Sequence, residues 1–383
     1  MRIVQLRGPS DGGIRAHIDM LVRAQRAAGH QVAVIEWVAR PRVGAVSQGY
    51  GSASATATLS PTCGASSSVD RGAPPVTSRD REGSWFQAGR WVARSARSAD
   101  VVHAHGLKAG ALAVLASRAA GRRRSRPAVV VTLHNLPVGS RRVRAMGAVL
   151  ARVVARSHAV LGVSEDVVAW AGGHGVRGAR WTPVPAPALG LPCHRREEVR
   201  TGLGVPTGVA LLVTVGRLAP QKGLDLAIDA AVHLNGATPP FVWLIAGEGP
   251  ERARLAARIE RAGVPIRLLG RRDDLPDLYH AADLVVSTAI WEGQPLGLQE
   301  ALRCGTPVVA TDVGGTRGVV GSGGLLVDRS PRKLAAAIVR VLDSPELLAD
   351  LRIKARRRGR DLPKPADMMA HVSAVYARAV ADG

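Results

Sequence analysis

The chain has 383 residues, of which 46% are hydrophobic and 3% aromatic, and its formal net charge is +22 at pH 7. That length exceeds what one hydrophobic core usually serves, so we expect two α/β domains. The scarcity of aromatic rings argues against a protein that stacks nucleic-acid bases, and the three scattered cysteines favour neither a disulfide framework nor a zinc site. No apolar run is long enough for a membrane span and the first residues are too polar for a signal peptide, so a cytoplasmic location is expected.

The first forty residues predict a βαβ unit. "RIVQL" and "QVAVIEWV" are strands, and "IRAHIDMLVRAQRAAGH" between them is an amphipathic helix. Gly12 and Gly13 stand together at the start of that helix, where backbone N–H groups and the helix dipole can hold an anion, although a plain flexible turn is an equal alternative. Glu36 ends the second strand where a nicotinamide-binding protein carries its ribose-binding acid, but the glycine fingerprint of those proteins is absent.

Residues 44–82 are small and polar, without periodicity, and predict a long mobile loop. Two further strands follow, "ADVVHAHG" and "AVVVTLHN", each of which ends in a histidine, His105 and His134. Those histidines fall at the sheet edge where ligand sites form, although a lone histidine at a strand end is more often structural. The proline-rich run "WTPVPAPALGLP" then indicates a linker between the domains.

The stretch 140–160 predicts a basic amphipathic helix with two alternative roles. On a helical wheel its arginines gather on one side, namely Arg141, Arg144, Arg152 and Arg156. Its apolar residues take the other side, namely Val143, Met146, Leu150 and Val153. In one interpretation the helix packs Val143, Leu150 and Val154 on the sheet with its arginines in water. In the other, the helix and the run "GRRRSRP" at 121–127 hold the domain against anionic lipid headgroups.

The second domain begins with the strand "ALLVTVG", the loop "RLAPQKG" and the helix "LDLAIDAAVHL". Arg217 and Lys222 lie in that loop, between the carboxyl end of a strand and the start of a helix. Two cations there suit a diphosphate, whereas isolated cations in loops are usually only solvated.

Further along, "WEGQPLGLQEALRCGTPVV" at 291–309 carries two glutamates eight positions apart. Gly293, Pro295 and Gly297 lie between them and argue against one continuous helix. We therefore expect Glu292 on a loop and Glu300 at the opening of the following helix, with the valine-rich strands "DLVVST" and "PVVAT" on either side. Ligands of open α/β sheets bind at such strand ends, although each glutamate alone fits a solvated or helix-capping role.

These segments, in this order, resemble the retaining glycosyltransferases of the GT-B fold, in the large group called family four. The most specific matches are "VGRLAPQKGLDLAIDA", "LGRRDDLPDLYHAADLVVS" and "EGQPLGLQEALRCGTPVVATDVGG". The resemblance implies an α/β chain with two Rossmann-like domains facing a cleft. Its parts would be an acceptor domain at 1–183, a linker at 184–207, a donor domain at 208–362, and a C-terminal helix at 363–383 that crosses back to the first domain.

The resemblance also implies roles for individual residues. Glu300 would hold the nucleotide ribose, Glu292 the transferred sugar, and His134 the reacting face of that sugar. Arg217 and Lys222 would neutralise the departing diphosphate in place of a metal, which agrees with the absence of an aspartate-x-aspartate triplet. The backbone would complete the donor site at Gly12, Gly13, Gly293, Gln294, Pro295 and Leu296, of which all but Pro295 offer an N–H group. The family's commoner "EGFG" is here "EGQP", which affects sugar identity more than sugar binding.

The implied activity is retaining, metal-independent transfer of a hexose from a UDP- or GDP-sugar to an unidentified acceptor, either lipid-linked or a cell-envelope glycan. No cofactor and no nucleic-acid partner are expected, while a lipid acceptor would place the protein at the inner face of an anionic membrane. Two alternatives are a GT-B-like nucleotide-sugar isomerase of the 2-epimerase type and a polyanion-binding protein that uses the basic surface. The sequence favours the transferase because three site motifs occur in register.

Overall fold

The computed structural model describes residues 1–8, 12–38, 81–82, 85–120, 126–236 and 239–382. Two compact units divide the chain. The first unit contains the described residues up to Val184 together with those from Pro363 onward, and the second contains Pro185–Leu362. None of the described helices is both long and apolar enough to cross a membrane.

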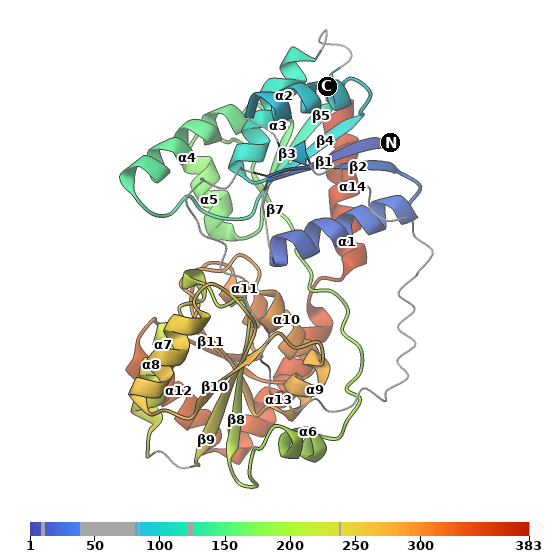
Figure 1. Cartoon of the computed structure of the whole chain (residues 1–383). Helices are drawn as coiled ribbons and strands as arrows, with labels where there is room; N and C mark the ends of the chain where they lie inside the picture. The colour runs from blue at the N-terminus through green and yellow to red at the C-terminus, as the bar shows by residue number, and fades with distance from the viewer. Residues whose placement is uncertain (9–11, 39–80, 83–84, 121–125, 237–238, 383) are drawn as a thin grey trace. The chain divides into compact units, whose positions relative to one another are not determined.

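The first unit is built on a parallel sheet of seven strands in the order β3-β2-β1-β4-β5-β6-β7 (Figure 1). Its strands are β1 (Arg2–Arg7), β2 (Gln31–Val38), β3 (Arg81–Glu82), β4 (Val101–His105), β5 (Ala128–Leu133), β6 (Ala159–Gly162) and β7 (Arg180–Trp181). Every residue of β4 and β5 is buried, as expected for strands covered on both faces by helices. The helices are α1 (Gly13–Ala27), α2 (Trp85–Ala96), α3 (Leu107–Ala119), α4 (Arg141–Val154), α5 (Glu165–Gly173) and α14 (Pro365–Ala381).

The last helix, α14, belongs to the core of the first unit. It packs against α1 and β5, and its side chains Met368, Val372 and Tyr376 are buried with Ile3 and Leu21 in one cluster. The Tyr376 hydroxyl is fully enclosed among polar groups of the sheet and of α1. The first unit is therefore completed by a segment that is distant from it in sequence.

Helix α4 is amphipathic in an unexpected way. The residues it buries are small or short, Gly147, Ala151 and Val154. The helix packs closely on α3, where a Cβ at Gly110 would lie 3.0 Å from the Val154 side chain, and on the preceding loop, where a Cβ at Gly147 would lie 2.5 Å from the ring of Pro137. Val143 and Met146 are 46% and 56% exposed. Of the three side chains expected to pack on the sheet, Val154 is buried and Leu150 half-buried, while the expectation for Val143 is wrong. Arginines and apolar side chains also share the solvent side of the helix, where opposite sides were expected.

The second unit holds a parallel sheet of six strands in the order β10-β9-β8-β11-β12-β13 (Figure 1). Its strands are β8 (Ala210–Val215), β9 (Phe241–Ala246), β10 (Ile266–Gly270), β11 (Leu284–Ser287), β12 (Val308–Thr311) and β13 (Gly324–Val327). Helices cover both faces and bury two separate apolar clusters against the sheet. They are α6 (Arg196–Gly202), the 3₁₀ turn η2 (Pro220–Lys222), α7 (Leu224–Leu234), α8 (Arg252–Ala262), α9 (Leu275–Ala281), α10 (Leu296–Arg303), α11 (Thr316–Val320), α12 (Pro331–Leu342) and α13 (Pro345–Asp361).

Two predicted connections differ from what the structure shows. The predicted linker 184–207 contains α6, whose Val199 is 1% exposed, and this helix packs with α9 in the second unit. An apolar side chain that must be buried therefore makes much of this segment part of the domain. Of the predicted mobile loop 44–82, only Arg81 and Glu82 are described, and they pair with β2 as a short strand; the rest lies outside the described residues.

Candidate functional site

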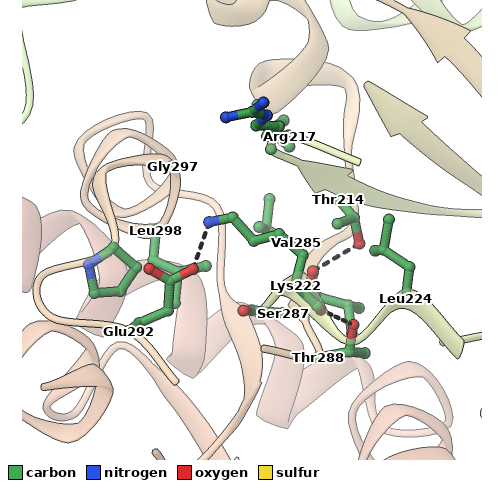
Figure 2. A pocket seen from close by; sticks show the side chains of 14 residues that line it. Thr214, Arg217, Lys222, Leu224, Val285, Ser287, Thr288, Glu292, Gly297 and Leu298 are labelled. Carbon is green, nitrogen blue, oxygen red and sulfur yellow. Dashed lines mark hydrogen bonds and ion pairs between the residues drawn. The ribbon is translucent and has the colours of Figure 1, made fainter. Parts of the chain in front are cut away.

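A pocket in the second unit forms where chain segments leave the carboxyl ends of β8 and β11 (Figure 2). The space among its lining residues, with the open solvent at its mouth, is about 440 Å³. Three segments that the sequence analysis singled out contribute to its wall: the loop with Arg217 and Lys222, the loop with Glu292, and the start of α10. In an open parallel sheet this is the edge where ligands bind.

Lys222 and Glu292 are in direct contact across the pocket. The Lys222 Nζ donates a hydrogen bond to Glu292 Oε1, and Figure 2 shows the lysine side chain reaching along the pocket to the carboxylate. The Glu292 side chain is 12% exposed and that of Lys222 is 30% exposed. A carboxylate so buried needs a charged or hydrogen-bonding partner, and here the partner is a cation that a ligand phosphate can also attract.

A short turn fixes the position of Lys222. The turn η2 ends at Gly223, which has φ 58 and begins α7. A Cβ at Gly223 would lie 2.4 Å from the Thr288 carbonyl oxygen, so only glycine fits this left-handed position. The Thr288 hydroxyl donates to the Lys222 carbonyl at 3.0 Å, which ties the lysine to the segment after β11.

The backbone around Glu292 is held from two sides. The Gly315 N–H donates to the Glu292 carbonyl at 2.8 Å, and a Cβ at Gly314 would lie 2.1 Å from the same oxygen. On the other side, the Gln221 amide donates to the Trp291 carbonyl at 2.9 Å. Glu292 thus sits on a loop, as predicted, and that loop is joined both to the lysine turn and to the segment after β12.

Helix α10 begins earlier than the sequence analysis predicted. It starts at Leu296, with Pro295 as its N-cap, so Glu300 lies in its second turn and does not open it. Proline is tolerated at a helix start because the first N–H groups have no partner within the helix, and Gly297 in the first turn allows close approach: its Cβ would lie 3.3 Å from the Val215 carbonyl. The N-terminus of α10 lines the pocket, and no acidic side chain occupies its first turn. The positive end of the helix dipole is therefore not neutralised by a carboxylate of that turn.

Glu300 is held by a tyrosine that the sequence analysis did not identify. The Tyr279 hydroxyl on α9 donates to Glu300 Oε2 at 2.9 Å. Burial raises the pKa of the Glu300 carboxyl, while the Tyr279 hydrogen bond and the charge of Arg303 oppose that rise. Tyr279 is itself fully buried, so it orients the carboxylate from within the core.

The remaining predicted donor residues of the second unit lie on the same loops. Gly293 and Pro295 are buried between Glu292 and α10, and Gln294 and Leu296 are half-buried beside them. Arg217 is exposed at the end of β8 and lines the pocket above the lysine and glutamate in Figure 2. Four of the predicted site residues of the second unit thus line the pocket: Arg217, Lys222, Glu292 and Pro295. The others adjoin them in sequence, and Glu300 lies one turn into α10.

The other predicted site residues belong to the first unit. Gly12 is the N-cap of α1 with φ 67, and Gly13 is the first residue of that helix. His134 follows β5 and is 7% exposed. Its Nε2 lies 3.1 Å from His105 Nδ1, and His17 on α1 packs against both rings. Sequence reasoning missed this grouping because the three histidines come from separate segments.

Glu36 has a structural partner. The buried guanidinium of Arg7 donates to its carboxylate at 3.1 Å from Nε and 2.7 Å from Nη2, and also to Asp19 at 3.2 Å. Arg7 on β1 therefore joins Glu36 on β2 to Asp19 on α1. This structural role explains the acid at Glu36, and no ribose is needed to explain it.

The sequence matches two family descriptions that together span most of its length. Residues 11–187 match Glycosyltransferase Family 4, and residues 195–358 match Glycosyl transferases group 1. The chain belongs to the group 1 glycosyltransferases. Its two Rossmann-like units have the GT-B fold, because the structure of HepE from Anabaena in complex with UDP-glucose superposes with a TM-score of 0.76 at 20% identity, over 98% of this chain and 99% of that one.

Curated relatives align over shorter stretches. The mannosyltransferase LpsB of lipopolysaccharide core biosynthesis from Rhizobium meliloti is 33% identical over 54% of this chain and 59% of its own length. The 2-deoxystreptamine glucosyltransferase of Streptomyces kanamyceticus is 33% identical over 41% of this chain and 43% of its own length. The chain thus spans about half the length of the curated relatives it matches.

Proposed function

We propose that this chain transfers a hexose from a UDP- or GDP-sugar to an acceptor hydroxyl with retention of configuration. The observation that carries the proposal is the Lys222–Glu292 pair, set beside the N-terminus of α10 in a pocket at the carboxyl edge of the second sheet. A lysine, a neighbouring arginine and a helix N-terminus form an anion site, while a carboxylate beside them can accept hydrogen bonds from sugar hydroxyls.

In this mechanism the pocket stabilises the leaving group. As the glycosidic bond of the donor breaks, negative charge grows on the diphosphate, and Lys222 and Arg217 offset it at the pocket wall. The N–H groups at the start of α10 supply further donors that need no reorganisation. Two cations and a helix dipole perform the work that Mg²⁺ does at other diphosphate sites, so we propose transfer without added metal or cofactor.

The two glutamates have different tasks in the proposed site. Glu292, paired with Lys222, contacts hydroxyls of the sugar, and its ion pair with the lysine is exchanged or shared when the diphosphate arrives. Glu300, oriented by Tyr279, accepts hydrogen bonds from the nucleotide ribose. Gly293 and Gln294 contribute backbone N–H groups between them.

His134 and the Gly12–Gly13 turn are the contributions we propose from the first unit. Burial lowers the pKa of His134 well below its ordinary value, so its ring is neutral near pH 7 and acts as a hydrogen-bonding group. The turn would present backbone N–H groups at the start of α1, where no acidic side chain occupies the first turn.

Exposed side chains of α4 support a membrane-associated acceptor. Val143, Met146 and Val149 are about half exposed and share the solvent side of the helix with arginines. Apolar side chains that insert among lipids, next to cations that meet anionic headgroups, are the features of an interfacial helix. We propose that α4 holds the protein at an anionic membrane surface and that the acceptor is a lipid-linked glycan. Of the run at 121–127, residues 121–125 lie outside the described part of the chain.

A donor screen tests the proposed function. Purified protein is heated with a panel of UDP- and GDP-sugars, and one of them is expected to raise its melting temperature, whereas Lys222→Ala should respond weakly or not at all. The same donor is then incubated with a membrane extract, and mass spectrometry should find a hexose added to a lipid or glycan. A product that is an epimerised nucleotide sugar would support the isomerase alternative. Binding of a polyanion, with no response to any nucleotide sugar, would support the alternative that the chain is a polyanion-binding protein.

A further inference from the structure

Three buried histidines of the first unit converge from three segments of the chain. His17 on α1, His105 at the end of β4 and His134 after β5 are 2%, 6% and 7% exposed. Each offers one ring nitrogen, and these nitrogens lie within 4.8 Å of one another. Among the residues that the structure describes, this is the one group of three or more histidine, cysteine, aspartate or glutamate side chains that is compact enough to surround one ion.

A glutamine fixes the proton of His105. The Gln5 amide nitrogen donates to Gln25 Oε1 at 2.9 Å and lies 3.2 Å from the Tyr376 hydroxyl, so its oxygen is left as an acceptor. That oxygen lies 2.8 Å from His105 Nε2, which therefore carries the ring proton. The Nδ1 of His105 is then an acceptor for His134 Nε2 at 3.1 Å, so metal binding would move the His134 proton to its other ring nitrogen.

One nitrogen of the cluster lacks a partner. His17 Nδ1 is fully buried and no hydrogen bond reaches it. A buried polar atom left in this state costs about 1–3 kcal/mol, so its position calls for an explanation. A ligand that accepts a nitrogen lone pair would remove that cost.

The three rings are buried and close together, which favours their neutral form because two neighbouring imidazolium ions would repel each other away from water. Neutral imidazole is the form that binds metals. The nearby cation is the buried guanidinium of Arg7, which is paired with Asp19 and Glu36.

We propose that His17, His105 and His134 bind one Zn²⁺ ion with ligands separate from the pocket of the second unit. His134 would bind through Nε2, which faces His105, so that its Nδ1–H remains for the hydrogen bond proposed to the donor sugar. Zinc–nitrogen bonds of about 2.0–2.1 Å in a tetrahedron place the ligand nitrogens about 3.3–3.4 Å apart. The His105–His134 pair, at 3.1 Å, is already near that separation, and the His17 nitrogen, which lies within 4.8 Å of both, would close in by at most about 1.5 Å. The Gln5 carbonyl on the far nitrogen of His105 is the outer contact that metal-bound histidines usually have.

The chemistry of the cluster also excludes the metals expected at a diphosphate. Mg²⁺ prefers oxygen ligands, whereas three imidazoles suit Zn²⁺, Co²⁺, Ni²⁺ or Cu²⁺. Three protein ligands leave a fourth position of the tetrahedron for water or a substrate oxygen. A metal here would be a second site, separate in ligands and in kind from the lysine and arginine that serve the diphosphate.

Metal binding is measured directly on the full chain, with any affinity tag removed. Protein stripped with a chelator is mixed with Co²⁺, whose visible absorption reports tetrahedral nitrogen ligation, and with Zn²⁺ followed by gel filtration and elemental analysis. We expect one metal per chain and a higher melting temperature with Zn²⁺. His17→Gln should lower the affinity about 100-fold or more, since loss of outer contacts alone costs 10–100-fold.

The control is His194→Gln, which removes the exposed histidine paired with Asp277 in the second unit and should leave metal binding unchanged. Less than about a tenth of one metal per wild-type chain would overturn the proposal, and the cluster would then be a hydrogen-bonded histidine pair. Equal binding by wild type and His17→Gln would overturn it as well. Folding of the variant is checked by its melting curve without metal. Titration of both proteins with the nucleotide sugar separates failure of this site from failure of the proposed transferase.

Discussion

Lys222 and Glu292, two residues of opposite charge that line the pocket at the ends of β8 and β11, form an ion pair with each other. The pair keeps a largely buried carboxylate compensated until a diphosphate competes for the lysine. Substitution of either partner should therefore change both the chemistry and the charge that remains in the pocket.

The first prediction separates the two glutamates. Glu292→Gln should lower kcat about 100-fold or more with little loss of donor affinity, because the lysine it releases remains available to the diphosphate. Glu300→Ala should instead weaken donor binding, since it removes the proposed ribose contact. Donor titration and initial rates on both variants measure this, with melting curves to show that they fold. Unchanged turnover in both would contradict the site assignment.

The second prediction concerns the leaving group. Lys222→Ala and Arg217→Ala should each lower kcat by about two orders of magnitude, as expected when a cation that offsets growing charge is lost. Addition of Mg²⁺ or Mn²⁺ should not raise the rate of chelator-treated wild type. Arg271→Ala removes an exposed arginine outside the pocket lining and serves as a matched control with wild-type rates. A strict requirement for either ion would show that the proposed leaving-group chemistry is wrong.

A third prediction tests the backbone that positions the lysine. Gly223→Ala should reduce both the melting temperature and donor affinity, because its φ of 58 and the Thr288 carbonyl at 2.4 Å leave no room for a Cβ. Gly318→Ala in α11 is the control, since nothing lies within 4 Å of its Cβ and alanine favours a helix. Thermal melts with and without donor compare the two. Equal behaviour would mean that the turn rearranges without affecting Lys222.

The fourth prediction concerns α4 and membranes. Sedimentation with anionic liposomes at low salt should carry the wild type down, whereas neutral liposomes or 1 M salt should not, because the Debye length falls from about 10 Å at 0.1 M to 3 Å at 1 M. Met146→Asp should weaken binding more than Ile353→Asp, a change of another exposed apolar side chain, on α13. Binding that ignores salt and lipid charge would contradict the proposed surface.

A fifth prediction follows from His194 and Asp277 at the start of the second unit. The hydrogen bond to Asp277, 2.7 Å from His194 Nδ1, raises the pKa of the imidazole above 6.5. Because the folded pKa lies above the unfolded one, the stabilisation is complete below about pH 6.5 and is lost as pH rises through the folded pKa. His194→Gln should therefore lower the melting temperature more at pH 6 than at pH 8.5. A difference that does not change with pH would contradict the ion pair.

Much of this fold follows from periodicity in the sequence. The buried strands are unbroken valine-rich runs, and α7 covers the expected "LDLAIDAAVHL", because apolar spacing at the helical period leaves few alternatives. The start of α10 was misplaced because the rule against proline and glycine applies to helix interiors, and here they occupy the N-cap and the first turn.

Other features depend on contacts that no local pattern reveals. The exposure of Val143 and Met146 could not be predicted from a helical wheel. The wheel shows which side chains share a face, but it does not show which face of the helix packs against the rest of the unit, and in α4 that is the face with the small residues. The Tyr279 hydrogen bond to Glu300 joins two helices, and the three-histidine cluster joins α1 to two strand ends. For the pocket, the sequence indicates which loops share a sheet edge. It does not show that the Lys222 and Glu292 side chains touch, because that contact joins two separate loops.

The position of α14 has a consequence for biosynthesis. Tyr376 supplies a hydroxyl to Gln5, Gln25 and His103 in the centre of the first unit, and Met368 and Val372 fill the apolar core around it. During translation the segments of β1 and α1 leave the ribosome long before this helix exists, and the whole second unit is made in between. The core of the first unit therefore stays incomplete, with polar groups still unpaired, until synthesis ends. A nascent chain stalled before Pro365 should expose a chaperone-binding surface on its N-terminal segments.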